Sequence, residues 1–258
     1  YRCTSMDHRE KPHIALCLHC SLIQIPKNEQ PANLGELYEG TVDELYLDNE
    51  HGRQVTFAKA FFHMEKYLPS SGRFLEIGAY CGLFLRLIKD KGWKTEGVEP
   101  SGWAVDIAKN RFGVNIHQGT LADNKERLGS DFNAAAAWDV LEHVQDPYSL
   151  LCDINFHLSD GGVLAFSTLD FDNWFPRFFL KWWPWLMPMH LHYFSRAILK
   201  RWLHHAGFKI LEVRRYQHFV TLGYFWEKII NILPRWLGPV MNGVSPLVQK
   251  HFLIKVSF

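Results

Sequence analysis

The chain has 258 residues, which is enough for one α/β domain of ordinary size with a small appendage. Hydrophobic residues make up 47% of it and charged residues 21%, a balance that excludes an intrinsically disordered protein. The formal net charge is +1 and no run of Lys or Arg is interleaved with the aromatic residues, so we expect no nucleic-acid partner.

Targeting signals are not visible in the sequence. We find no secretory leader and no window of about 18 uncharged apolar residues that would span a membrane. The five cysteines are an odd number, which favours reduced thiols or metal ligands over a disulfide framework. We therefore expect a cytoplasmic protein.

By composition the chain divides into three parts: a Cys-rich module over residues 1–36, a helical lead-in over 37–72 and a main domain over 73–258. The main domain carries an aromatic insertion at residues 169–193. The lead-in is predicted to be helical because four apolar residues recur at helical spacing: Phe57, Phe61, Met64 and Leu68. Pro69-Ser-Ser-Gly72 then ends the pattern.

From residue 73 onward, short apolar strands alternate with helices. The predicted strands are 73–77, 94–98, 114–117, 133–138, 163–168, 208–214 and 251–258. The predicted helices are 83–89, 102–111, 147–158 and 195–206. Asn133–Ala137 alone would also suit a helix, but the alternation requires a strand there. The pattern predicts an α/β, Rossmann-like sheet of seven mostly parallel strands with helices on both faces.

The most informative stretch is Phe74-Leu-Glu-Ile-Gly-Ala-Tyr-Cys-Gly82, where a buried strand runs into a glycine turn that opens a helix. A dinucleotide site would need G-x-G-x-x-G, and here Tyr80 and Leu83 occupy the second and third glycine positions. The remaining pattern, Glu76-x-Gly78-x-x-x-Gly82, places a carboxylate beside the turn and suits a cationic ligand with an amino-acid tail.

A second carboxylate follows the next strand. Glu99 lies 21 residues beyond Gly78, where a carboxylate can accept both ribose hydroxyls of a nucleoside. A lone Glu after a strand is also commonly a solvated loop residue, but its spacing from the glycine turn favours the ribose role.

The ordered series of motifs resembles class I S-adenosylmethionine-dependent methyltransferases over roughly residues 37–215. The series is Glu76-x-Gly78-x-x-x-Gly82, Gly97-Val-Glu-Pro-Ser101, Gly119-Thr-Leu121, Trp138-Asp-Val-Leu-Glu-His143, Asp146-Pro147, Ser159-Asp-Gly-Gly162 and His190-Leu-His-Tyr-Phe-Ser195. Tyr80 stands where the family often has glycine.

The resemblance implies S-adenosylmethionine as cofactor and places the glycines against its methionine and ribose, Glu99 on the ribose hydroxyls and residues 119–121 beside the adenine. The complete set of implied cofactor-binding residues is Glu76, Gly78, Ala79, Tyr80, Gly82, Glu99, Pro100, Gly119, Thr120, Leu121, Trp138 and Asp139.

Methyl transfer requires alignment of the nucleophile and a base only where the acceptor must lose a proton. Three histidines near the expected carboxyl edge of the sheet are candidates for that base: His143, His190 and His192. The alternative for each histidine is a structural role. His143 would then stabilise the loop of the fourth motif, which begins at Trp138. Of His190 and His192, one would pack beside Tyr193 and Phe194 and the other would face solvent.

The N-terminal region contains a C-x-x-C pair, Cys17-Leu-His-Cys20, with Cys3 and His8 upstream. Together these four residues could supply the ligands of a structural zinc ion. The segment resembles the Cys-rich zinc module that precedes some sugar and small-molecule methyltransferases, except that a fourth cysteine is absent. Free thiols are the alternative.

Residues 171–189 carry eight aromatic side chains, and three prolines prevent a single long helix. One interpretation is a lid that walls off the substrate, and stacking on a sugar or aromatic acceptor would use the same residues. The other is an interfacial patch, joined by 219–241, that contacts a membrane peripherally to reach a lipid-linked substrate.

From these patterns we expect methyl transfer to a small-molecule acceptor, such as a sugar or a lipid-linked intermediate. A non-catalytic protein that binds cofactor and a partner on the same fold is the first alternative. A nicotinamide oxidoreductase is the second, and the failed glycine fingerprint counts against it.

Overall fold

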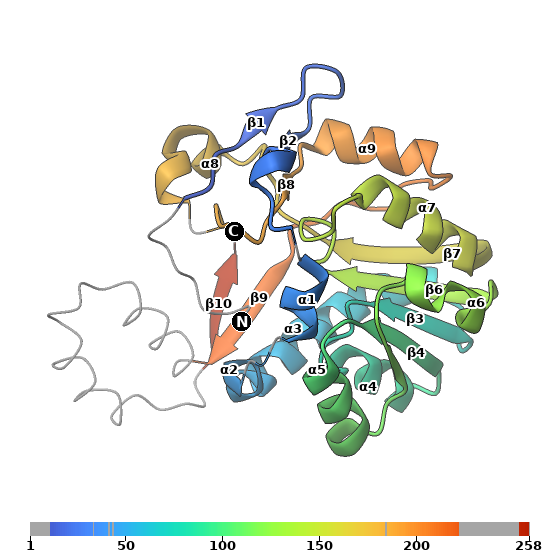
Figure 1. Ribbon diagram of the computed structural model, residues 1–258. Coiled ribbons are helices and arrows are strands. Elements are labelled where there is room, and N and C mark those ends of the chain that lie inside the picture. Colours follow the sequence, from blue (N-terminus) through green and yellow to red (C-terminus); the bar gives the residue numbers. More distant parts are fainter. Residues whose placement is uncertain are drawn as a thin grey trace, which may run out of the picture.

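The computed structural model of the protein describes residues 11–32, 34–40, 42, 44–183, 185–221 and 253–257 (Figure 1). Its centre is a five-stranded parallel sheet with the order β5-β4-β3-β6-β7. The strands are β3 (Arg73–Ile77), β4 (Lys94–Glu99), β5 (Ile116–Gln118), β6 (Phe132–Trp138) and β7 (Leu158–Ser167). The Rossmann-like character predicted from the alternation of strands and helices is confirmed.

Helices cover both faces of this sheet because its strands are apolar on both sides. Successive residues of β3 alternate between two separate cores, with Phe74 in one and Leu75 in the other. The same alternation runs through Ala134–Ala137 of β6, all four fully buried, where small side chains allow the helices to approach closely.

The first core lies under α3 (Glu50–Met64), α4 (Leu83–Asp90) and α5 (Gly102–Ile107). The second lies under α6 (Lys125–Leu128), α7 (Pro147–His157) and α9 (Arg196–His205). Sequence signals explain where several helices begin: the side chains of Ser101, Asp146 and Ser195 accept hydrogen bonds from backbone N–H groups in the first turns of α5, α7 and α9.

The strand order reverses between β3 and β6, because β4 and β5 extend the sheet on one side of β3 while β6 and β7 extend it on the other. Open parallel sheets bind ligands at the carboxyl ends of the strands beside such a reversal. The glycine turn after β3 and the Trp138-Asp139 pair after β6 therefore lie at the expected position of a ligand.

The prediction of seven strands in one sheet is wrong for the described residues. The segment predicted as a strand at Phe208–Arg214 has no strand partner, and most of its side chains are exposed. The strand instead begins at residue 217: β9 (Gln217–Thr221) pairs antiparallel with β10 (Leu253–Ser257) in a separate two-stranded sheet.

The β9 strand packs on α3 rather than on the central sheet. The N–H of Phe219 donates to Thr56 Oγ1 and the N–H of Thr221 donates to Asn49 Oδ1, each at 2.8 Å. Gly52 permits this approach, because a Cβ atom there would lie 2.4 Å from the carbonyl oxygen of Phe219. Thus the lead-in helix and the C-terminal part of the chain pack against each other.

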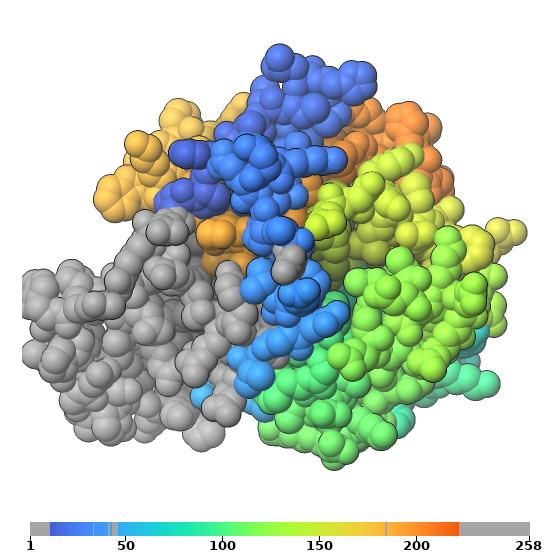
Figure 2. All heavy atoms as spheres, in the orientation of Figure 1, coloured from blue at the N-terminus to red at the C-terminus, as the bar shows by residue number. Residues whose placement is uncertain are grey.

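The N-terminal segment packs on the main domain through a small sheet of its own. Strands β1 (Ala15–Leu16), β2 (Ile23–Gln24) and β8 (His192–Tyr193) pair antiparallel, so the Cys-rich segment and the aromatic insertion share one sheet. In Figure 2 the blue residues near the N-terminus run across the face, with the gold atoms of the insertion on one side and green atoms of the main domain on the other.

Short helical segments complete the described structure. They are η1 (Lys27–Glu29), α1 (Leu34–Glu39), α2 (Glu44–Asp48), η2 (Glu65–Tyr67), η3 (Ala108–Phe112), η4 (Ala122–Asn124), α8 (Trp174–Phe179) and η5 (Leu180–Trp182). Among the described helices, none combines the length and apolar character that crossing a bilayer requires.

Candidate cofactor and acceptor site

The glycine turn after β3 has the backbone geometry that its sequence predicts. Gly78, Tyr80 and Gly82 all have positive φ angles, 66°, 46° and 76°. Glycine adopts this conformation without steric cost, whereas Tyr80 adopts it at a cost of about 1–2 kcal/mol. The tyrosine thus preserves the turn that a glycine would make, and its ring packs on Tyr46 and Trp103 with centroid distances of 4.4 and 6.0 Å.

The turn is fixed to the second strand by backbone hydrogen bonds. The N–H groups of Gly78 and Ala79 both donate to the carbonyl oxygen of Val98, at 2.9 and 3.1 Å. A Cβ atom on Gly82 would lie 2.4 Å from the side chain of Val114, so this glycine also allows α4 to begin close to β5. The turn is therefore a fixed part of the sheet edge.

Glu99 connects the end of β4 to the turn. One carboxylate oxygen accepts from the N–H of Tyr80 and the other from the N–H of Ser101, each at 2.9 Å. The side chain is buried, and this burial raises its pKa while the two N–H donors favour the charged form. Each oxygen retains lone-pair capacity, so the carboxylate can also accept hydroxyl groups of a ligand.

Glu76 projects from β3 into the same buried region. Burial raises its pKa well above the ordinary value, and the nearby Glu99 raises it further, although a hydrogen bond with the backbone of Leu85 acts in the opposite direction. Its Oε2 atom is buried with no hydrogen-bond partner among the described residues. An unpaired buried carboxylate oxygen of this kind fits a cationic ligand group.

Residues 119–121 follow β5 on the other side of Glu99. The N–H of Gly119 donates to the carbonyl oxygen of Glu99 at 2.9 Å, and Leu121 is buried. Asp123 accepts hydrogen bonds from both the N–H and the hydroxyl of Thr120, which orders the loop. The structure therefore brings this segment beside the end of β4. The contact recorded for Pro100, another predicted cofactor residue, is a hydrogen bond of 3.4 Å that its carbonyl oxygen accepts from the side-chain amide of Gln118.

Trp138 and Asp139 end β6 at the other edge of the turn. Asp139 has a φ of 53°, and its side chain accepts a hydrogen bond of 2.6 Å from the hydroxyl of Ser167. The indole Nε1 of Trp138 is buried and has no partner in the described part of the chain. The ring stacks on Tyr216 with a centroid distance of 5.4 Å and an interplanar angle of 5°.

Four residues that the sequence patterns did not identify cover this region: Tyr46, Arg53, Tyr216 and His218. The guanidinium of Arg53 lies 3.9 Å from the ring centroid of Tyr46. Burial raises the pKa of Tyr216 well above its ordinary value and lowers that of His218, whose Nε2 lies 4.0 Å from Asp139 Oδ2. No local motif marked these residues, because they come together only when α2, α3 and residues 216–218 pack around the turn and Trp138.

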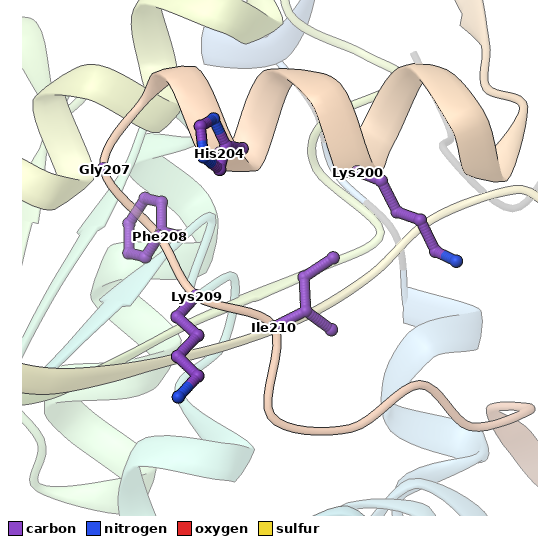
Figure 3. Close-up of a pocket in the computed structure, with 6 residues that line it drawn as sticks. All are labelled: Lys200, His204, Gly207, Phe208, Lys209 and Ile210. Atoms are coloured by element: carbon purple, nitrogen blue, oxygen red, sulfur yellow. The ribbon is translucent and has the colours of Figure 1, made fainter.

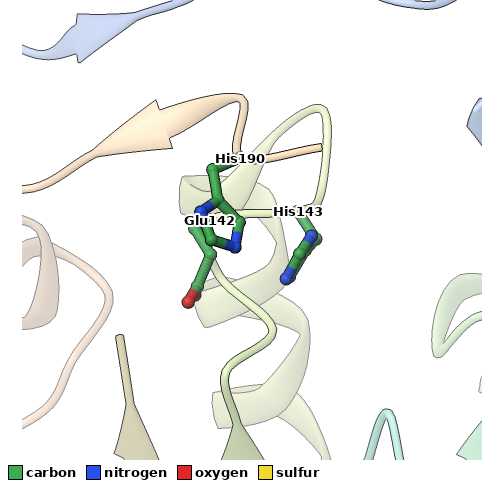
Figure 4. A group of neighbouring side chains, drawn as sticks. All are labelled: Glu142, His143 and His190. Atoms are coloured by element: carbon green, nitrogen blue, oxygen red, sulfur yellow. The ribbon is translucent and has the colours of Figure 1, made fainter. Parts of the chain in front are cut away.

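Two of the three predicted catalytic histidines lie together. His143 follows β6 and His190 precedes β8, and their ring centroids are 4.7 Å apart (Figure 4). Burial lowers the pKa of His143 to about 4 and that of His190 to about 3. Both imidazoles are therefore neutral near pH 7 and are weaker bases than an ordinary histidine.

Glu142 lies beside these histidines and was not selected from the sequence as a site residue, although it belongs to the fourth motif. Its Oε2 accepts a hydrogen bond of 2.9 Å from the hydroxyl of Thr168. Burial and the nearby Asp139 raise its pKa to about 8. The third predicted histidine, His192, lies in β8, where its backbone N–H donates to the carbonyl oxygen of Glu142 at 3.3 Å and its ring lies 6.2 Å from that of Phe194, but its side chain does not belong to this cluster. Its catalytic role and those of His143 and His190 stay predictions.

Of the four predicted zinc ligands, Cys3 and His8 lie outside the described residues. Cys17 and Cys20 lie in the turn between β1 and β2, where the N–H of Ser21 donates to the carbonyl oxygen of Cys17 at 2.7 Å. Hydrogen bonds from the backbone and thiol of Cys20 lower the pKa of Cys17. Two thiols that lie in one turn, with the pKa of Cys17 lowered toward the metal-binding thiolate form, fit two ligands of a zinc knuckle.

A separate surface hollow of about 510 Å³ lies at the end of α9 (Figure 3). Its lining is Lys200, His204, Gly207, Phe208, Lys209 and Ile210. It contains none of the predicted cofactor residues, so the candidate site is defined by the turn and strand ends described above.

Comparison with known proteins identifies the class to which this fold and site belong. A family model described as a methyltransferase domain matches residues 50–213, and the chain belongs to that family. A search of curated proteins gave no match.

Solved structures share the fold. The chain is similar to a methyltransferase from Thermotoga maritima, described as S-adenosylmethionine-dependent and a possible histamine N-methyltransferase. The identity is 26%, with 62% of this chain and 73% of that one covered and a TM-score of 0.50. An S-adenosylmethionine-dependent methyltransferase from Archaeoglobus fulgidus shares the fold at 17% identity, with 84% and 100% covered and a TM-score of 0.53. The YcgJ protein of Bacillus subtilis does so at 15% identity, with 72% and 81% covered and a TM-score of 0.51.

Proposed function

We propose that the protein transfers a methyl group from S-adenosylmethionine to a small-molecule acceptor, a sugar or a lipid-linked intermediate. The observation that carries this proposal is the position of Glu99, whose carboxylate is hydrogen-bonded to the glycine turn at the point where the strand order reverses. Bound S-adenosylmethionine supplies a methyl group that its sulfonium has already activated.

Residues at the carboxyl edge of the sheet would bind and orient this cofactor. The Glu99 carboxylate would accept the ribose hydroxyls, while the unpaired Oε2 of Glu76 would face the cationic amino-acid portion. Residues 119–121 would line the adenine, and Trp138 with Asp139 would form the pocket edge. Tyr46 and Tyr216 would exclude water from the reacting atoms, because Tyr46 packs on Tyr80 of the turn and Tyr216 stacks on Trp138.

A lipid-linked acceptor is supported by an exposed aromatic surface on the insertion, formed by Trp174, Phe178, Phe179 and Trp182 of α8 and η5. Trp182 and Phe178 are 79% and 78% exposed. The rest of the insertion packs inward, since Trp183 and Leu186 form a buried cluster with Tyr193. The buried side of the insertion would thus enclose the substrate pocket, and its exposed aromatic side would contact the membrane interface. Residues 219–241 lie almost wholly outside the described residues.

We also propose that Cys17 and Cys20 hold a structural zinc ion with two ligands from upstream. The support is their shared turn and the lowered pKa of Cys17, since the thiolate is the form that binds metal. Zinc content measured by mass spectrometry, before and after Cys17→Ser with Cys20→Ser, tests this assignment.

The main experiment has two steps. Calorimetry with purified protein should detect binding of S-adenosylmethionine and S-adenosylhomocysteine, and addition of sugar or polyprenyl-linked sugar acceptors should produce S-adenosylhomocysteine. Binding without turnover on any acceptor of either class would favour the non-catalytic alternative. No binding of either ligand to folded protein would overturn the proposal.

A further inference from the structure

The strongest unexplained group of side chains is Glu142, His143 and His190. One potential ligand atom from each residue lies within 4.8 Å of the others. All three side chains are buried or half-buried, at the carboxyl edge of the sheet beside Thr168. None of the roles proposed above uses this cluster, and two imidazoles and a carboxyl group at this spacing are the ligand types that bind transition-metal ions.

The hydrogen bonds of the two histidines decide which nitrogen of each ring is available. Nδ1 of His143 lies 3.0 Å from the carbonyl oxygen of Met189, and Nδ1 of His190 lies 2.7 Å from that of Trp185. A carbonyl oxygen can only accept, so each contact is a hydrogen bond when Nδ1 carries the hydrogen, and the hydroxyl of Tyr38, 2.9 Å from Nδ1 of His143, then accepts as well. The lone pair of each neutral ring is therefore on Nε2, which is the protonation pattern of a metal-ligating histidine.

Outer contacts hold all three groups in place. Besides the two carbonyl oxygens, the hydroxyl of Tyr38 lies 2.9 Å from Nδ1 of His143, and the hydroxyl of Thr168 donates to the Glu142 carboxylate. Ligating histidines in proteins commonly donate their second N–H to a carbonyl oxygen, and ligating carboxylates are commonly hydrogen-bonded as well. The cluster thus has the supporting contacts of a metal site.

We propose that Glu142, His143 and His190 bind a divalent transition-metal ion such as Zn²⁺ or Co²⁺. Ligand atoms in a tetrahedral zinc site lie roughly 3.4 Å apart, given bonds of about 2.1 Å, so small side-chain rotations would close the cluster around an ion. Imidazole nitrogens favour this class of metal over Mg²⁺ or Ca²⁺, which prefer oxygen ligands. Three protein ligands leave at least one coordination position for water or an acceptor oxygen.

This site is distinct from the cysteine pair in the N-terminal turn, and the experiment must separate the two. The full-length chain with Cys17→Ser and Cys20→Ser is treated with a chelator and then titrated with Co²⁺. We expect one bound Co²⁺ ion with visible d–d absorption and no thiolate charge-transfer band. Loss of an outer contact of a ligating residue already weakens metal binding by about 10–100-fold. The further substitution His190→Gln removes a ligand itself and should weaken binding by at least about 100-fold, whereas His204→Gln, at an exposed histidine of α9, should leave it unchanged.

Two results would overturn the proposal: no Co²⁺ uptake by the folded Cys17→Ser, Cys20→Ser chain, or equal uptake with and without His190. If circular dichroism shows that the His190 variant fails to fold, pulsed electron paramagnetic resonance of Cu²⁺ bound to the Cys17→Ser, Cys20→Ser chain replaces it. Coupling to two imidazole nitrogens supports the site, and coupling to fewer than two contradicts it.

Discussion

The carboxylate of Glu99 accepts a hydrogen bond of 2.9 Å from the backbone N–H of Tyr80, 19 residues earlier in the chain. This contact ties the end of β4 to the glycine turn after β3. It also holds Tyr80 in a left-handed conformation that a tyrosine rarely adopts. One side chain thereby shapes the turn and remains available to a ligand.

Substitution of Glu99 should therefore affect both stability and cofactor binding. Glu99→Ala leaves the N–H groups of Tyr80 and Ser101 without their acceptor, at a cost of about 1–3 kcal/mol for each group that stays buried and unpaired. We expect a lower melting temperature and at least about a 10-fold loss of affinity for S-adenosylhomocysteine, equivalent to 1.4 kcal/mol. Calorimetry on the folded fraction checks this, with the exposed Glu126→Ala as control. Unchanged affinity would contradict the role of Glu99.

Cofactor binding should depend on pH through Glu76. In the free protein burial raises its pKa, so this carboxyl stays protonated to a higher pH than usual. A bound cation favours the carboxylate, so binding should release a proton. Affinity should then rise with pH, by at most about 10-fold per pH unit, until the pH exceeds the raised pKa.

Calorimetry in buffers of different ionisation enthalpy measures this proton release. In Glu76→Gln both the proton release and the rise of affinity with pH should disappear, whereas Glu126→Gln should retain them. Proton release that persists in the Glu76 variant would assign it to another group.

The packing of β9 on α3 should depend on Gly52. A methyl group there would meet the carbonyl oxygen of Phe219 at 2.4 Å and Asn49 Oδ1 at 2.5 Å, so Gly52→Ala should destabilise the protein by about 1–3 kcal/mol. Gly35 in α1 is the matched control, because a Cβ atom there meets nothing within 4 Å and alanine favours a helix by about 1 kcal/mol. Thermal unfolding measures both. Equal effects of the two substitutions would show that the contact at Gly52 is unimportant.

The exposed aromatic surface should mediate membrane contact. Combined replacement of Trp174, Phe178 and Trp182 by serine removes apolar area that is exposed to solvent, so it should reduce cosedimentation with vesicles of phosphatidylglycerol and phosphatidylcholine and leave the melting temperature nearly unchanged. Phe62→Ser, at a side chain of α3 that is 65% exposed, should leave cosedimentation unaffected. If the unsubstituted protein does not sediment with vesicles, the surface does not bind membranes.

The sequence by itself determined the parallel sheet with helices on both faces and the glycine turn. These features follow from local signals: apolar strands, capping residues such as Ser101 and Asp146, and glycines where positive φ angles are needed. Glu99 could be predicted because its distance along the chain from Gly78 is set by one strand–helix–strand unit.

The tertiary structure alone decided where the C-terminal part of the chain goes and what surrounds the site. No local pattern shows that β9 packs on α3 instead of joining the central sheet. This packing depends on a close backbone contact between Gly52 and Phe219, which are more than 160 residues apart in the sequence. The same holds for the contacts of Tyr46 with Tyr80 and of Tyr216 with Trp138, and for the approach of His190 to Glu142 and His143. Such juxtapositions result from packing between distant segments, which periodicity and spacing along the chain do not encode.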